Sequence, residues 1–224
     1  MKNVIGNGDD APVVFRMNRG GTTQFFPALC VGDIVNVREE MLNVKQFKQY
    51  NVRECGIEPR LHALFSSPHQ DAKVGSGYQY GRVKVANNPL NEHPVISNVA
   101  HNLAGRFKLS NKEWNIGCHL VMYQDGQDSI NWHADDTQGE DLVVSLTVNG
   151  PLNPRAIYFQ PENTNDLQNG DEQIELFPLA GDAYSMDAGF QHGYVHAMLK
   201  TRKAEIKSGK RMAIIFRNGI SKSK

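Results

Sequence analysis

The chain has 224 residues, of which 40% are hydrophobic and 21% are charged, a composition typical of a globular protein with one core. Its 24 Lys and Arg residues equal its 24 Asp and Glu residues, so it lacks the basic excess typical of strong duplex-DNA binders. No apolar run approaches the roughly 20 residues that a membrane-spanning helix needs, and the N-terminus has no signal-peptide pattern.

Two helices are predicted in the first half of the chain. Residues 1–24 are expected to be irregular, because glycines interrupt any periodic pattern there. A helix is predicted from Asp33, which can cap it, to about Tyr50, since apolar residues recur at helical spacing. A second helix is predicted to begin after Pro94 and to end at Gly105.

After residue 117 the pattern changes to short segments of strand character, most of them separated by turn residues. The predicted strands are His119–Tyr123, Ser129–His133, Leu142–Val148, Ala156–Phe159, Gln173–Phe177, Ala183–Met186, Tyr194–Met198 and Arg211–Phe216. This spacing favours a mostly β fold, a jelly roll or a barrel, with the N-terminal helices packed on one sheet. We therefore expect one domain over residues 25–219, an irregular segment over 1–24 and a tail over 220–224.

The first chemical signal lies in residues 131–136. His133 and Asp135 are two apart on a predicted strand, so an imidazole and a carboxylate point to the same face. A second imidazole from a distant strand would complete the two-histidine, one-carboxylate set that binds Fe(II) and leaves three positions open. His192 and His196 are the candidates, and we prefer His196 because it lies within a predicted strand. Taken singly, a His-x-Asp pair is common by chance, and a lone histidine is more often structural.

A second signal is the pair Arg211 and Arg217. Their even spacing puts both guanidinium groups on one strand face with Ala213 and Ile215. If that face is buried, the arginines need anions, and a dicarboxylate bound at the metal would supply one. The alternative is an amphipathic strand with both arginines in water, and the spacing alone does not decide between the two.

Together these motifs resemble the AlkB group of Fe(II)- and 2-oxoglutarate-dependent dioxygenases, over about residues 25–219. The motif order is His133-x-Asp135, then His196, then the arginine pair. Further segments that carry the resemblance are Glu58-Pro59-Arg60-Leu61, Tyr78-Gln79-Tyr80-Gly81 followed by Pro89 and Pro94, Tyr123-Gln124-Asp125-Gly126, Val144-Ser145-Leu146 and Gly181-Asp182.

The resemblance implies a double-stranded β-helix (jelly-roll) core and an oxidoreductase that consumes 2-oxoglutarate and O₂. The Fe(II) ligands that it implies are His133, Asp135 and His196. It implies that Arg211 binds the distal carboxylate of 2-oxoglutarate with help from the Tyr123 hydroxyl, and that Arg217 lies near the metal-proximal carboxylate and Asp135. The family usually has asparagine at two positions that are Val121 and Ala213 here, so part of its polar cradle is missing.

The resemblance also implies a substrate class, the N-alkylated nucleobases of nucleic acids, which would be oxidatively demethylated. Enzymes that act on a base hold it unstacked among aromatic and polar groups. The candidates here are Tyr78, Tyr80, Arg82 and Trp132, although composition favours ordinary core or strand residues at these positions. Charge balance and the missing asparagines favour the alternative, an oxygenase for a small metabolite, nucleoside or amino-acid derivative. A binding module without activity is disfavoured by the intact motifs. We rank nucleic acid first.

The remaining features concern partners and location. Cys30, Cys55 and Cys118 match no zinc spacing, so we expect free thiols in a soluble intracellular protein of the cytoplasm or nucleus. The basic run over residues 200–211 is interpreted as a solvated loop in preference to a nucleic-acid patch. We expect a monomer with no membrane partner.

Overall fold

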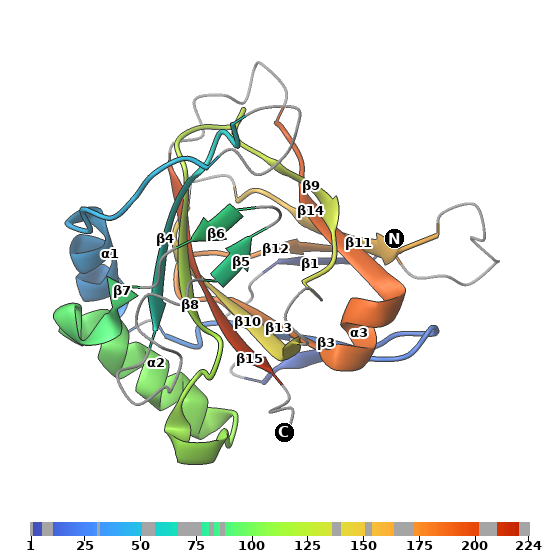
Figure 1. Cartoon of the computed structure of the whole chain (residues 1–224). Helices are drawn as coiled ribbons and strands as arrows, with labels where there is room; N and C mark the ends of the chain where they lie inside the picture. The colour runs from blue at the N-terminus through green and yellow to red at the C-terminus, as the bar shows by residue number, and fades with distance from the viewer. Residues whose placement is uncertain are drawn as a thin grey trace.

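The computed structural model describes residues 2–5, 11–30, 32–50, 57–66, 78–80, 83–85, 88–135, 140–150, 154–163, 173–201 and 210–219. Within these ranges no helix is both long and apolar enough to cross a membrane. β-Strands are the predominant regular structure, and they form two larger sheets and one small hairpin (Figure 1).

The larger sheet has eight strands. Their order is β2 (Val13–Arg16), β3 (Thr22–Phe26), β13 (Ala183–Asp187), β10 (Glu140–Asn149), β15 (Arg211–Gly219), β8 (Gly117–Tyr123), β4 (Leu61–Ser66) and β7 (Asn88–Pro89). The smaller sheet has five strands. Their order is β1 (Lys2–Ile5), β12 (Ile174–Phe177), β11 (Ile157–Pro161), β14 (Tyr194–Met198) and β9 (Ile130–His133). Strands β5 (Tyr78–Tyr80) and β6 (Val83–Val85) form the hairpin.

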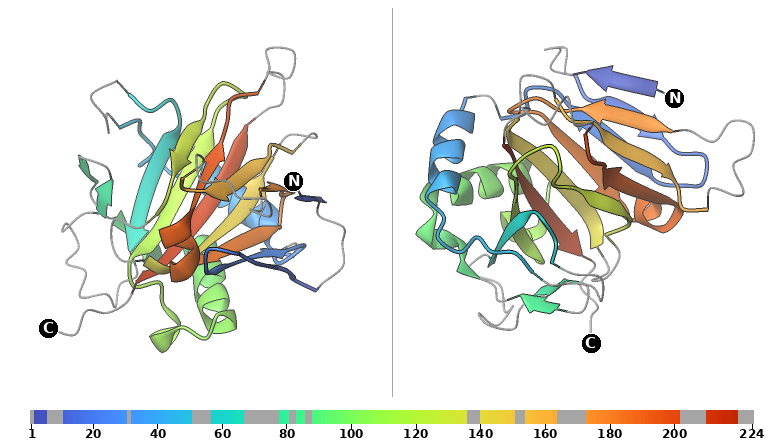
Figure 2. Two further views of the ribbon diagram at one scale, coloured as in Figure 1. Left: turned by 90° about the vertical axis from the view of Figure 1, so that its right-hand side faces the viewer. Right: turned by 90° about the horizontal axis from the view of Figure 1, so that it is seen from above.

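Helices cover one face of the larger sheet. They are α1 (Ile34–Leu42) and α2 (Pro94–Arg106), with the 3₁₀ turns Leu90–Glu92 and Ser110–Lys112 on either side of α2. Figures 1 and 2 show α1 and α2 on the side of the larger sheet that faces away from the smaller one. Their buried apolar residues pack with one face of β4, β8, β10 and β15 into a continuous core. A short third helix, α3 (Ala188–Gly193), connects β13 to β14.

The predicted fold class is confirmed, and each of the eight predicted strands corresponds to one of β8 to β15. The expected irregular segment over residues 1–24 is wrong, because it contains β1, β2 and most of β3. Strands β2 and β3 extend the larger sheet through pairing of β3 with β13. The glycines interrupted the sequence pattern, but tertiary pairing with a strand far along the chain decides the local structure.

The first predicted helix is shorter than expected. It ends at Leu42, and the Asn43 side chain donates to the Glu39 carbonyl at 3.0 Å, a local bond that competes with further helical turns. Val44 stays buried in the core although it lies beyond the end of the helix. Asp33 occupies the N-cap position without a side-chain cap bond. The second helix extends one residue beyond Gly105.

A second core lies between the two sheets and surrounds the site. It combines residues of β8, β10, β13 and β15 with residues of β11, β12 and β14. Strand β15 shows why one sheet can serve two cores. Met212, Ile214 and Phe216 face the helices, whereas Ala213 and Ile215 face the smaller sheet, as the alternation predicts.

A close backbone contact fixes the connection that leads to β14. Gly21 has a φ of +82°, and a Cβ added to it would lie 1.9 Å from the backbone nitrogen of Phe190 in α3. Only glycine allows this approach of β3 to the helix. The same helix is capped by Asp187, whose side chain accepts from the Phe190 amide at 2.8 Å. Strand β14, which carries His196, therefore starts from a fixed position.

Candidate metal centre and cavity

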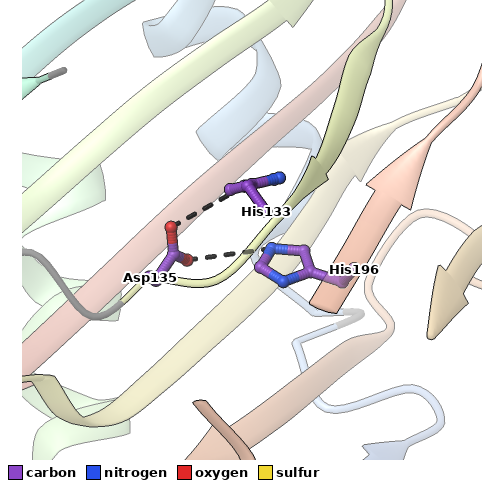
Figure 3. A group of neighbouring side chains, drawn as sticks. All are labelled: His133, Asp135 and His196. Atoms are coloured by element: carbon purple, nitrogen blue, oxygen red, sulfur yellow. Dashed lines mark ion pairs between the residues drawn. The ribbon is translucent and has the colours of Figure 1, made fainter. Parts of the chain in front are cut away.

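Three potential metal ligands converge where β9 ends beside β14. His196 on β14 is the register partner of His133 at the end of β9, and Asp135 follows two residues later. One ligand atom from each lies within 4.8 Å of the other two. The Asp135 carboxylate oxygens lie 3.8 Å from Nε2 of His133 and 3.8 Å from Nε2 of His196 (Figure 3).

The protonation of these groups suits a divalent cation. Burial lowers the pKa of His133 and lowers that of His196 to about 3, so both imidazoles are neutral near pH 7. Burial acts to raise the pKa of Asp135, but the Arg217 guanidinium and the two imidazoles outweigh it and hold that pKa well below its usual range. The Nδ1 atom of His133 lies 2.8 Å from the Asn131 carbonyl, which fixes the proton there and leaves the Nε2 lone pair facing the cluster.

The donor set therefore fits a metal that accepts imidazole and carboxylate. Both nitrogen–oxygen separations exceed hydrogen-bond length, so the imidazoles and the carboxylate do not satisfy one another directly. Two histidines and one carboxylate on one side of an ion are typical of non-haem Fe(II) centres with open positions. Within the described ranges, no other group of three such side chains comes this close together.

The cluster opens into a cavity between the two sheets. Arg211, Arg217 and Arg60 all line it, and none of the three is more than 4% exposed. The alternative in which the arginines of β15 point into water is therefore excluded. With Asp135 as the acidic side chain lining the cavity in the described chain, the cavity has an excess of positive charge.

Two of these guanidinium groups already have carboxylate partners. Arg60 Nε lies 3.0 Å from the Glu58 carboxylate, and Arg217 Nη2 lies 3.3 Å from the Asp135 carboxylate. Arg211 differs, because across the described ranges no carboxylate lies within ion-pair distance of it. Its Nη2 donates to the Thr147 hydroxyl at 3.3 Å, and its Nε is buried with no hydrogen-bond partner in the described structure.

Tyr123 stands at the centre of this positive region. It is the register partner of Arg211, whose guanidinium carbon lies 5.6 Å from the tyrosine ring centroid. The Tyr123 hydroxyl accepts a hydrogen bond from Arg60 Nη1 at 2.9 Å. Arg155 approaches the ring at 5.4 Å, but its Nη atoms are held by backbone carbonyls, among them that of Asp128. Arg211 thus remains the guanidinium beside Tyr123 that needs an anion.

Val121 and Ala213, the two positions at which the resembled family usually has asparagine, are neighbours. They are register partners on β8 and β15, and both line the cavity. This part of the cavity wall is therefore apolar. The hydroxyls of Ser145 and Tyr184 line the same cavity, and burial raises the pKa of Tyr184 to about 12, so its hydroxyl stays protonated. Both hydroxyls offer polar contacts; Ser145 lies in a segment that carries the family resemblance, whereas Tyr184 was not among the predicted residues.

The other candidate residues lie apart from the cluster or outside the described side chains. His192 is exposed on α3 and is not part of the cluster. Trp132 is half-buried with its ring 6.4 Å from that of Tyr158, and it does not line the cavity. Tyr78 and Tyr80 belong to β5, whose backbone alone is described, and residues 81–82 lie outside the described chain.

Two further predictions concern cysteines and basic residues. Cys30 and Cys118 are free, whereas residue 55 lies outside the described ranges. Most of the basic run, residues 202–209, also lies outside them.

Sequence reasoning missed two buried histidines, His62 and His119. His119 lines the cavity, and its Nε2 lies 2.7 Å from Nδ1 of His62. The signal for His119 was present, since it is four residues before Tyr123 on the same strand and must share its face. His62 had no such signal, because no strand was predicted from the residue pattern there, whereas Arg60 lies in the segment 58–61 that carries the family resemblance.

We expect acid to destabilise the protein through His62. Burial and Arg60 lower its pKa from 6.5 to about 4, against the opposing effect of Glu58. As pH falls from about 6.5 to about 4, the unfolded chain takes up a proton that the folded chain does not. The free energy of unfolding should drop by about 1.4 kcal/mol per pH unit for this imidazole. This contribution of His62 to the free energy of unfolding is fully present above pH 6.5, the pKa in the unfolded chain. It is lost as the pH falls towards about 4, the pKa in the folded chain.

Urea unfolding followed by circular dichroism across this pH window measures the effect. In His62→Gln, the slope of the free energy of unfolding against pH should decrease by the amount that corresponds to about one proton. The slope should not vanish, because burial also lowers the pKa of His119. Equal pH slopes for the wild type and His62→Gln would contradict the assignment.

Comparisons with known proteins agree with this geometry. A family model described as the 2OG-Fe(II) oxygenase superfamily matches residues 33–217. No curated protein matches the sequence. Among solved structures, a 2OG-Fe(II) oxygenase family oxidoreductase from Burkholderia pseudomallei aligns with a TM-score of 0.56 and 11% identity, covering 87% of this chain and 84% of the other.

Two other solved structures show how widely the fold is used. A prolyl hydroxylase from Trichoplax adhaerens, in complex with a hypoxia-inducible factor peptide, has a TM-score of 0.52 and 12% identity over 94% of this chain and 84% of its own. OsALKBH1 has a TM-score of 0.53 and 12% identity over 93% of this chain and 100% of its own. At these identities the likeness establishes the fold alone.

Proposed function

This chain belongs to the 2OG-Fe(II) oxygenase superfamily, and from that premise we propose that it hydroxylates a substrate C–H bond at the centre formed by His133, Asp135 and His196. Members of the superfamily are dioxygenases that use Fe(II), 2-oxoglutarate and O₂. One observation carries the residue assignment. The ligand cluster shares its cavity with Arg211, a buried guanidinium for which the described chain provides no carboxylate.

In this proposal the protein's own residues bind and orient. His133, Asp135 and His196 would hold the ion, and a set of three protein ligands would leave positions for 2-oxoglutarate and O₂. Bound Fe(II) would supply the activation of O₂ that is coupled to decarboxylation of 2-oxoglutarate to succinate and CO₂. Arg211 binds the distal carboxylate of 2-oxoglutarate through two parallel hydrogen bonds, and the ring of Tyr123 lies beside the guanidinium group. Arg217 keeps Asp135 ionised and oriented through its bond at 3.3 Å.

The cavity wall also excludes water from this charge pairing. Apolar side chains of both sheets line it, among them Ile130, Val143, Ile157 and Met186. An ion pair between Arg211 and a carboxylate is stronger in such surroundings than in water. Because β2 and β3 belong to the larger sheet, we place residues 13–24 within the oxygenase domain together with the expected 25–219.

For the substrate, we propose N-alkylated nucleobases in nucleic acid, on the strength of the combined sequence motifs. Hydroxylation of an N-methyl carbon gives a hemiaminal, which collapses to release formaldehyde. A second candidate is a small metabolite, nucleoside or amino-acid derivative. It is favoured by the apolar Val121–Ala213 pair in the cavity wall and by the equal numbers of acidic and basic residues.

A turnover assay with Fe(II), 2-oxoglutarate and O₂ tests both levels of the proposal. Succinate and formaldehyde should be measured with methylated oligonucleotides, methylated nucleosides, a proline-containing peptide and a metabolite panel. Succinate formation that stops when the iron is chelated supports the dioxygenase assignment of this site. Formaldehyde from an oligonucleotide but not from its nucleoside supports the nucleic-acid substrate. Product from the metabolite or nucleoside arm alone would replace it with the second candidate.

A further inference from the structure

A row of polar side chains, all but the half-buried Glu58 buried, leads from the start of β4 to the candidate metal centre. In order, it consists of Glu58, His62, His119, Arg217 and Asp135. The separations are 3.0 Å from the Glu58 carboxylate to Nε2 of His62, 2.7 Å from Nδ1 of His62 to Nε2 of His119, 3.3 Å from Nδ1 of His119 to Nη1 of Arg217, and 3.3 Å from Nη2 of Arg217 to Asp135. The three middle members are at most 4% exposed.

Strand pairing explains why these side chains meet. His119 on β8 is the register partner of Ile215 on β15, so Arg217 is its diagonal neighbour on the same face. On the other side, His119 pairs with Leu64 of β4, which makes His62 the diagonal neighbour there. The row thus crosses three adjacent strands of the larger sheet on the face that lines the cavity. Long side chains bridge such diagonal positions readily.

The hydrogen bonds in this row can run in one direction only. A guanidinium group has donors and no acceptor, so Arg217 must donate to Nδ1 of His119. His119 therefore holds its proton on Nε2 and donates it to Nδ1 of His62. His62 in turn holds its proton on Nε2 and donates to the ionised Glu58. All four ring nitrogens are used, and both histidines have the same Nε2–H tautomer.

We propose that Glu58, His62 and His119 are positioning residues that hold the Arg217 guanidinium in the plane required to present Asp135 to the metal. The inference rests on the proposed function only in taking Asp135 as a metal ligand. His119 is suited to this task because a neutral imidazole accepts a hydrogen bond from Arg217 without adding a negative charge. A carboxylate at that position would compete with Asp135 for the guanidinium group. At the other end of the row, the ionised Glu58 can only accept a hydrogen bond, so it holds the proton of His62 on Nε2.

The tautomers can be read directly in the wild-type protein without metal. Two-bond ¹H–¹⁵N correlation spectra of uniformly ¹⁵N-labelled protein distinguish the Nε2–H, Nδ1–H and doubly protonated forms of each imidazole. Near neutral pH we expect the Nε2–H pattern for both His62 and His119. An Nδ1–H tautomer or an imidazolium at His119 would overturn the proposal, because neither can accept from Arg217. This test is independent of metal binding, of turnover and of substrate identity.

Substitutions at His119 test the consequence for the metal centre. Outer hydrogen-bond partners of metal ligands are typically worth 10–100-fold in metal affinity, so His119→Leu should weaken Mn(II) binding by roughly 10-fold or more. His119→Asn keeps an oxygen acceptor near the Nδ1 position and should recover most of that loss. His93→Asn, which replaces an imidazole that packs against Phe65 outside the row, is the matched control and should bind Mn(II) as the wild type does.

The outcomes separate this inference from the proposed function. Titration calorimetry gives Mn(II) affinity, and thermal unfolding of each variant shows whether it is folded. Folded His119→Leu with wild-type affinity, or no recovery in His119→Asn, would overturn the positioning role. A wild type that binds no Mn(II) would overturn the metal assignment itself, whereas the tautomer pattern would still test the row. If His119→Leu does not fold, the comparison of His119→Asn with the wild type and the tautomer spectra decide.

Discussion

Alanine at His133, Asp135 or His196 is expected to abolish both metal binding and turnover. Each substitution removes one of the three ligand atoms that lie within 4.8 Å of one another, and two remaining ligands hold an ion too weakly to organise the co-substrate. Mn(II) titration calorimetry should detect no binding in the range where the wild type saturates. Succinate formation with Fe(II) should fall to the level of the iron-free control.

The matched control for this experiment is His192→Ala. His192 is four residues from His196 along the chain, but it is exposed on α3 and lies outside the cluster. This variant should bind metal and turn over like the wild type. An active His196→Ala together with an inactive His192→Ala would mean that the wrong histidine was assigned. Retained Mn(II) binding in all three ligand variants would remove the centre from consideration.

Stability should separate the three ligand variants. Asp135→Ala removes the carboxylate that contacts Arg217 at 3.3 Å, and loss of one partner from a buried ion pair typically costs about 3–5 kcal/mol. His133→Ala and His196→Ala remove neutral imidazoles and should cost less. Loss of activity must therefore be measured on protein shown by circular dichroism to be folded, above all for Asp135→Ala.

Local sequence patterns predicted the β-rich half of the chain because its strands are short and separated by turns. The two faces of β15 were predictable for the same reason, since period-two alternation requires no knowledge of the partner strands. Whether the arginine face was buried could not be predicted. That depends on the smaller sheet, which covers the face through residues such as Phe159 and Met198.

The parts that were missed depend on contacts between distant segments. Strand β3 exists because Phe25 and Phe26 pair with β13, about 160 residues later in the chain, and no local pattern contains that information. Glu58 and His62 enter the site only through the pairing of β4 with β8. The tautomers of His62 and His119 depend on Arg217. Because Arg217 can only donate to His119, it determines which ring nitrogen of each histidine carries the proton. Pairing and register between distant strands, which a local sequence pattern does not reveal, thus determined most of the surroundings of the ligands.

Arg211→Ala is expected to raise the KM for 2-oxoglutarate by about 30-fold or more, which corresponds to about 2 kcal/mol for one partner of a buried charge pair. Turnover at saturating 2-oxoglutarate should change less, because the three metal ligands remain. Arg211→Lys should lie between the two, since lysine keeps the charge but loses the fork that matches a carboxylate. Arg106→Ala, which changes an exposed arginine at the end of α2, is the matched control and should leave the KM unchanged.

A second keto acid makes this prediction specific for the distal carboxylate. 2-Oxobutanoate keeps the keto-acid end that would bind the metal but has no distal carboxylate for Arg211 to pair with. The wild type should strongly prefer 2-oxoglutarate, whereas Arg211→Ala should lose most of that preference, because the guanidinium group acts on one co-substrate only. If Arg211→Ala impaired both keto acids equally, its effect would be structural and the distal carboxylate would bind elsewhere. Arg60 would then be the next candidate, because it lines the same cavity and donates to the Tyr123 hydroxyl at 2.9 Å.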